Sequence, residues 1–206
     1  MGMAILSVDA DHPRMERLRM WIIHRLYIIE SAHLCYNVDE TGLITVQKPV
    51  KDVASHGVHS HGVRKVAQMT SAERSTLITA CCCVNAIGNS VPPFFIYPRV
   101  HFKQHMINSG PAGCVGVANM SGLMNSENFV IWLKHFIDHT RCSKERKVLL
   151  LLDNHESQVS ATNLDTCKEN GIVMVTLPLH CSHKLQPLNR SVFGLLKRYD
   201  NASCDS

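Results

Sequence analysis

Two acidic residues follow extended segments in a way that suits metal-assisted chemistry. Asp153 comes directly after the apolar run Val148–Leu152, which is typical of a strand buried on both faces. Polar groups at the carboxyl end of such a strand lie at the sheet edge, where open α/β sheets place their ligands. Asp39 follows a second extended segment. Two strand-end carboxylates can hold divalent cations that activate water against a phosphodiester, although Asp also ends strands for turn or capping reasons.

A third polar segment, residues 180–189, follows the apolar run over 172–177. If the three segments belong to neighbouring strands, their polar ends meet at one edge of a sheet. The residues alone therefore indicate a metal site built on Asp39 and Asp153.

The elements that must position these residues form a mixed α/β pattern. Early strands are followed by alternating helices and strands, which favours a mixed sheet flanked by helices over a doubly wound parallel one. We predict strands at 34–38 and 43–47 around a turn at Gly42, an antiparallel pair at 75–85 and 91–97, helices at 125–139 and 160–170, and strands at 148–152 and 172–177. Residues 98–124 look irregular, and a last helix begins near Asn189 or Arg190 with Val192, Phe193, Leu195 and Leu196 facing inward.

Composition narrows the class of protein. The 206 residues are 45% hydrophobic and 18% charged, enough to bury the core of one ordinary domain. A net charge of +4 permits a polyanionic partner without requiring one. Nine cysteines without a C-x-x-C pair favour reduced thiols in an intracellular protein. No apolar run reaches the roughly 18 residues of a membrane span, so no membrane partner is expected.

Three ordered motifs resemble the DDE superfamily endonuclease domain, in particular the pogo, Tigger and jerky branch of the mariner-like transposases. The motifs lie at 36–42 (YNVDETG), 151–157 (LLDNHES) and 180–193 (HCSHKLQPLNRSVF). The resemblance implies a ribonuclease-H-like fold and a nuclear, DNA-directed role. Apolar residues at helical spacing over 14–30 predict an N-terminal helical extension (1–33), and the resemblance places the DDE endonuclease domain at 34–200, followed by a tail (201–206).

In that family three acids hold the catalytic metal, and the matching positions here are Asp39, Asp153 and Asn189. The amide of Asn189 offers a neutral oxygen and no charge. Two divalent cations carry four positive charges, which the carboxylates of Asp39 and Asp153 offset poorly. The resemblance therefore implies weak binding of Mg²⁺ (or Mn²⁺) by Asp39 and Asp153, with DNA cleavage abolished or nearly so. A second departure is Gln158, where the family commonly has His.

The domain is expected to bind DNA through its phosphates with little sequence dependence. Only some 35 residues precede the first motif, too few for the paired helix-turn-helix modules of the family, so sequence-specific recognition is not expected. For His155 and His183 a structural hydrogen bond and a contact to a phosphate or to the metal shell both remain open, and Lys184 is either solvated or a phosphate contact. Candidate nucleic-acid contacts are Lys48, Lys51, His56, Arg64, Lys65, Arg99, Lys103, His155, His183, Lys184 and the basic loop 141–147.

Three functions compete on this sequence, and a homodimer is left open for each. The favoured one is a nucleic-acid-binding domain of nuclease fold with impaired catalysis. The others are an active Mg²⁺-dependent endonuclease that tolerates Asn189 and a domesticated protein-interaction scaffold that no longer touches DNA. A fragment that does not fold stably is a fourth possibility.

Overall fold

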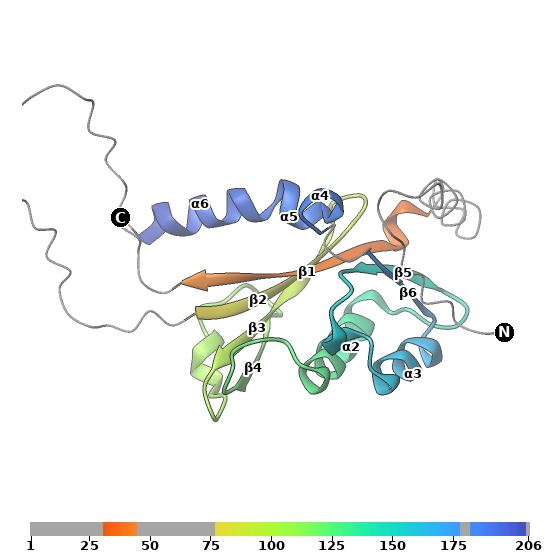
Figure 1. The fold of residues 1–206 in the computed structure, drawn as a ribbon, viewed down its shortest axis with the longest axis horizontal. Coiled ribbons are helices and arrows are strands. Elements are labelled where there is room, and N and C mark those ends of the chain that lie inside the picture. Colours follow the sequence, from red (N-terminus) through yellow and green to blue (C-terminus); the bar gives the residue numbers. More distant parts are fainter. Residues whose placement is uncertain (1–30, 45–76, 178–181, 205–206) are drawn as a thin grey trace, which may run out of the picture.

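Six strands form one mixed sheet in the computed structural model of the chain, which describes residues 31–44, 77–177 and 182–204. The order across the sheet is β4-β3-β2-β1-β5-β6 (Figure 1). The strands are β1 (Cys35–Ile44), β2 (Leu77–Asn85), β3 (Ser90–Pro98), β4 (Val115–Asn119), β5 (Val148–Leu152) and β6 (Ile172–Thr176). Residues 1–30, which hold the predicted N-terminal helix, and residues 45–76 lie outside the described residues.

β1 has neighbours of both kinds, because β2 is the one strand of the described sheet that runs against the others. It pairs with β2 antiparallel and with β5 parallel, and Asn37 is opposite Leu151. β2 and β3 are antiparallel, whereas β5–β6 and β3–β4 are parallel pairs. Carrying the β1–β5 register two residues further places Asp153 level with Asp39. The predicted mixed sheet is confirmed, and its register brings two motifs together.

Helices cover both faces of this sheet (Figure 1). On one face lie α2 (Ser126–Thr140) and α3 (Ala161–Glu169), and on the other α5 (Pro187–Ser191) and α6 (Phe193–Cys204). The short elements are η1 (Ala32–Leu34), η2 (Gln104–Ile107), η3 (Glu156–Gln158) and α4 (Ser182–Leu185). α2 begins where Asn125 Oδ1 accepts a hydrogen bond from the Asn128 N–H at 2.8 Å, which caps the helix.

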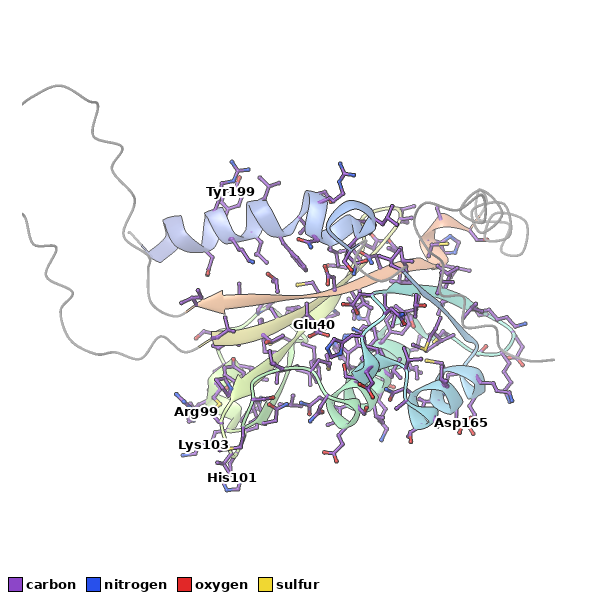
Figure 2. All side chains as sticks on the ribbon, viewed as in Figure 1. Glu40, Arg99, His101, Lys103, Asp165 and Tyr199 are labelled. Atoms are coloured by element: carbon purple, nitrogen blue, oxygen red, sulfur yellow. The ribbon has the colours of Figure 1, made fainter. Side chains whose placement is uncertain are left out.

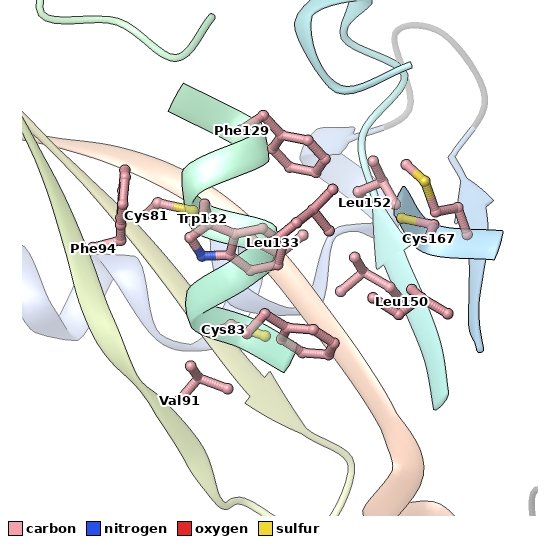
Figure 3. Close-up of a cluster of buried hydrophobic side chains, with 14 of the residues drawn as sticks. Cys81, Cys83, Val91, Phe94, Phe129, Trp132, Leu133, Leu150, Leu152 and Cys167 are labelled. Carbon is pink, nitrogen blue, oxygen red and sulfur yellow. The ribbon is translucent and has the colours of Figure 1, made fainter. Parts of the chain in front are cut away.

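The core lies between α2 and the sheet (Figure 3). Phe129, Trp132 and Phe136 stack along α2 with ring centroids 5.2 and 5.3 Å apart. Tyr36 of β1 meets Phe136 edge-on at 5.1 Å. Burial of such apolar surface is the main favourable contribution to the free energy of folding. Here the contact of Tyr36 with Phe136 packs β1 against α2.

β1 is one continuous strand, so the turn predicted at Gly42 is wrong. Gly42 pairs with Thr79 inside the β1–β2 ladder. A Cβ at Gly42 would lie 2.6 Å from Leu77 Cδ1, so the glycine makes room for a neighbouring side chain.

Three further predictions about elements are wrong. Residues 98–124 are not irregular throughout, because they contain η2 and β4. Val192 and Leu195 do not face inward, since their side chains are 39% and 46% exposed. The predicted single helix is in fact α5 followed by α6, and this break leaves Phe193 buried while its neighbours face solvent.

Candidate active site

β1 directs its two consecutive acids to opposite faces of the sheet. Side chains alternate along a strand, so Asp39 shares a face with Asn37, and Glu40 shares a face with Tyr36. Tyr36 packs on Phe136 of α2, which identifies the Glu40 side as the α2 face. Asp39 therefore lies on the face that α5 covers.

Asp39 is a half-buried carboxylate held by hydrogen bonds. The Glu40 N–H donates to Asp39 Oδ1 at 2.9 Å, and the Gln186 side chain also hydrogen-bonds this carboxyl group. Burial raises the pKa of Asp39 to about 6; these hydrogen bonds oppose the rise, and repulsion from Asp153 adds to it. Asp39 and Asp153 are thus close enough to feel each other's charge.

Glu40 interacts with Asp153 as well. Burial raises the pKa of Glu40 to about 7, and repulsion from Asp153 is the second cause. Gln158 Nε2 donates to Glu40 Oε1 at 3.3 Å and opposes the rise. Asp153 is therefore within electrostatic reach of both acids of β1.

Asp153 has one carboxylate oxygen without a partner. Its Oδ1 is buried, and the described part of the chain offers it no hydrogen bond. A buried acceptor left unpaired costs about 1–3 kcal/mol, more if it is charged. Such an oxygen beside a second carboxylate suits a cation.

A buried amide network ties the third segment to β1. Asn37 Nδ2 donates to Leu151 O and to Gln186 Oε1, both at 3.2 Å. Gln186 Nε2 donates to Val38 O at 2.9 Å, and the Leu188 N–H donates to Asn37 Oδ1 at 3.1 Å. Because Gln186 is fully buried, these bonds hold α5 firmly against β1.

Position 189 follows Leu188 within α5, on the Asp39 side of the sheet. The side chain of Asn189 is exposed. The structure thus brings all three motifs to one region, with Asp39 and Asp153 in electrostatic contact and an exposed amide next to the anchored turn.

The donor set fits one hard cation better than two. In residues 31–44, 77–177 and 182–204, no three His, Cys, Asp or Glu side chains gather closely enough to hold a metal ion. Asp39 and Asp153 still supply the oxygen ligands that Mg²⁺ and Mn²⁺ prefer, and Asp153 Oδ1 is unpaired. Water would complete the shell of an ion bound there.

The proposed nucleic-acid contacts are spread over the molecule. Arg99 and Lys103 are exposed beyond the end of β3, and Figure 2 shows them with His101, well apart from Glu40. His155 caps η3, and its Nδ1 lies 2.8 Å from Ser157 Oγ, so it has a structural hydrogen bond. Lys48, Lys51, His56, Arg64 and Lys65 lie outside the described residues, as do the side chains of His183 and Lys184.

Sequence reasoning missed Asn37 and Gln186 as parts of the site, and it noted Gln158 only as a departure from the family motif. Each is buried and hydrogen-bonded to the acids or their strand. The available signal was an Asn inside an otherwise apolar strand, two residues before Asp39 and therefore on the same face.

A mixed sheet with helices on both faces, and with acids at neighbouring strands, is a ribonuclease-H-like fold. It resembles the catalytic domain of Mos1 mariner transposase with a TM-score of 0.50 at 12% identity, over 95% of this chain and 75% of that one. The Mos1 mariner paired end complex with Mn gives a TM-score of 0.54 at 14% identity, over 97% and 52%. The Mos1 paired-end complex with left transposon end gives 0.53 at 12% identity, over 97% and 52%. At such identities the likeness concerns the fold.

Sequence comparison gives the family. The model of the DDE superfamily endonuclease matches residues 74–203, and the chain belongs to that family. The chain is also 33% identical over 166 residues to a protein named MFS-type transporter clz9 from Cochliobolus lunatus, over 79% of this chain and 18% of that protein. It thus spans less than a fifth of that relative and about half of the Mos1 chains in the complexes. Among the described helices, none is both long and apolar enough to cross a bilayer.

Proposed function

We propose that the chain is a transposon-derived DDE domain of the pogo, Tigger and jerky branch that binds DNA in the nucleus and cleaves it poorly. One observation carries this proposal. Two carboxylates, Asp39 and Asp153, converge from neighbouring strands, while the third family position is the exposed amide Asn189.

Asp39 and Asp153 would hold the cation. When bound, a divalent cation supplies charge for the scissile phosphate and activates a water. Gln186 restrains the Asp39 carboxyl group by hydrogen bonding, and Asn37 fixes α5 beside it. Asn189 cannot neutralise a second positive charge, so a two-ion arrangement is disfavoured.

DNA binding rests on the exposed basic side chains and the net charge of +4. The phosphate backbone supplies most of such affinity, which falls steeply with salt and depends little on sequence. We also propose that the chain forms a homodimer, because the similar Mos1 structures are paired-end complexes.

The test is nicking of supercoiled plasmid with Mg²⁺ or Mn²⁺. We expect Asn189→Asp to nick roughly 10–100-fold faster than the wild type, because the third charge is restored. Asn108→Asp, at an exposed position beyond β3, is the matched control and should stay at the wild-type rate. Adding Asp153→Asn to Asn189→Asp should abolish the gain.

Two results would contradict the proposal. One is wild-type nicking as fast as that of Asn189→Asp, which would indicate an active enzyme. The other is the absence of DNA binding at low salt, which would favour a protein-interaction scaffold.

A further inference from the structure

α6 has apolar residues on two sides, and only one of these sides packs on the sheet. Phe193 is buried and Leu196 is half-buried, so this pair faces inward. Leu195 and Tyr199 lie on the outer surface, where they are 46% and 70% exposed. Figure 2 shows Tyr199 on the side of α6 that points away from the sheet. The outer side therefore presents large apolar groups to solvent.

Val192 extends this outer side by one turn. The Leu196 N–H donates to Val192 O at 2.9 Å, which places Val192 on the first turn of the helix. Val192 is also exposed, and Leu195 and Tyr199 follow it at spacings of three and then four residues. Such spacings put side chains on one face of a helix, as in the seam between two packed helices. We call Val192, Leu195 and Tyr199 the α6 stripe.

The charge beside the α6 stripe is positive. Arg198 is exposed, and it lies next to Leu195 and Tyr199 on the helix surface because it follows Leu195 by almost one turn. The sequence has no Asp or Glu from position 170 to position 199. A partner that covers the stripe therefore meets a positive charge at its border.

Charge decides between the possible occupants of the stripe. A second copy of α6 packed antiparallel would place Arg198 of both copies on the same side of the interface, and like charges there are unfavourable. A DNA backbone would be attracted to Arg198, but it offers the apolar stripe little to pack against. An amphipathic helix with acidic residues beside its apolar side matches both the stripe and the charge.

We propose that the α6 stripe docks an amphipathic helix of a partner protein, with acidic residues flanking the apolar side of that helix. Apolar side chains of the partner pack on the stripe, and a carboxylate of the partner pairs with Arg198. Tyr199 and Arg198 are of the residue types that most often dominate the energy of such interfaces. The inference does not depend on the proposed function, because it uses neither the acids of β1 and β5 nor DNA.

The test is fluorescence anisotropy of a labelled peptide titrated with the full chain. The peptide has about three heptads, with Leu at the a and d positions and Glu at the e and g positions. We expect it to bind at least about 10-fold more tightly than a peptide with Lys in place of Glu. Leu195→Gln should weaken its binding about 10-fold, whereas Ile87→Gln, at an exposed apolar residue between β2 and β3, should stay within about two-fold of the wild type.

The contribution of charge is tested by a second matched pair of variants. Arg198→Glu reverses the charge beside the stripe and should weaken binding of the acidic peptide at least about 10-fold. Lys197→Glu makes the same change on the opposite side of α6 and should weaken binding by less than about three-fold. Thermal melts check that the variants fold, and these exposed positions should change the Tm little.

The inference is overturned if the acidic peptide does not bind, or if it binds no more tightly than the Lys peptide. Equal losses within either pair of variants also overturn it. Sedimentation velocity tests the second copy, since a dimer that Leu195→Gln dissociates would show that another copy of the chain covers the stripe. If Leu195→Gln weakens DNA binding and leaves peptide binding unchanged, the stripe belongs to a DNA surface instead.

Discussion

At the scale of single residues, Asp39, Glu40 and Asp153 place three carboxyl groups around the part of β1 that extends beyond β5. Burial raises the pKa values of Asp39 and Glu40 to about 6 and about 7, and repulsion from Asp153 adds to both. Holding these groups ionised costs folding free energy. A site that accepts this cost in the free protein is arranged for a positively charged ligand.

The raised pKa values predict how stability depends on pH in buffer with EDTA. Between its ordinary value of 4.5 and about 7, folded Glu40 keeps a proton that the unfolded chain has released, so the unfolding free energy falls as pH rises. For Glu40 this amounts to about 3 kcal/mol. The difference between wild-type and Glu40→Gln unfolding curves from pH 4.5 to 8 isolates it, since the histidines titrate in both. An unfolding free energy of the wild type that increases with pH relative to that of Glu40→Gln would contradict this prediction.

At the scale of elements, the decisive contact is α5 on β1 through amides. Gln186 joins Asn37, Val38 and Asp39 although it is 149 residues from Asn37 along the chain. Its removal takes one hydrogen bond from Asn37 Nδ2 and one from the Val38 carbonyl in a dry environment. α5 would then lose its fixed position against the Asp39 face.

Gln186→Ala should therefore lower the unfolding free energy by about 2–4 kcal/mol, measured by urea denaturation. Gln104→Ala, at an exposed position in η2, is the matched control and should change it by less than about 0.5 kcal/mol. Equal effects of the two substitutions would show that the amide network does not hold α5.

The elements that sequence predicts well carry their signal locally. β5 is an unbroken apolar run, and α2 and α3 have helical spacing with caps at Asn125 and Ser160. β4 was missed because it has only five residues and includes a glycine, which weakens any strand pattern. Gly42 suggested a turn because glycine is common in turns. The contact that explains this glycine is with Leu77, which is far away in the sequence and could not be predicted from it.

The candidate site divides in the same way. Asp39 and Asp153 could be proposed because an extended segment precedes each of them in the sequence, although Asp39 proves to lie inside β1. The partners of these acids could not be predicted from the sequence. Asn37–Gln186 and Glu40–Gln158 are long-range pairs that no local spacing reveals. Strand alternation alone predicts that Asp39 and Glu40 point to opposite faces of the sheet. Only the structure shows which protein groups each of the two side chains meets there.

At the scale of the whole molecule, Arg99, His101 and Lys103 gather at one end of the molecule (Figure 2). Arg99 and Lys103 follow β3, which runs in the same direction as β1, so they lie toward the carboxyl ends of these two strands. At the amino end of β5, Lys144, Lys147 and Lys168 line a hollow together with Asp165 and Glu169. Those two acids offset the lysines, so we expect DNA to favour the first group.

Replacing Arg99 and Lys103 together by Ala should weaken non-specific DNA binding and reduce the slope of log affinity against log salt by about two, as measured by fluorescence anisotropy. Replacing Lys144 and Lys147 removes the same charge and should have a smaller effect. A larger loss from the Lys144 and Lys147 pair would place DNA on the opposite edge of the sheet.

The central claim is that three remote segments form one acidic site that lacks a charge at position 189. The most direct measurement is the manganese anomalous difference map of an Asn189→Asp crystal grown with Mn²⁺. We predict an ion within about 2.0–2.4 Å of carboxylate oxygens at positions 39, 153 and 189. An ion in that variant with no contact to position 189 or to Asp39 would contradict the claim.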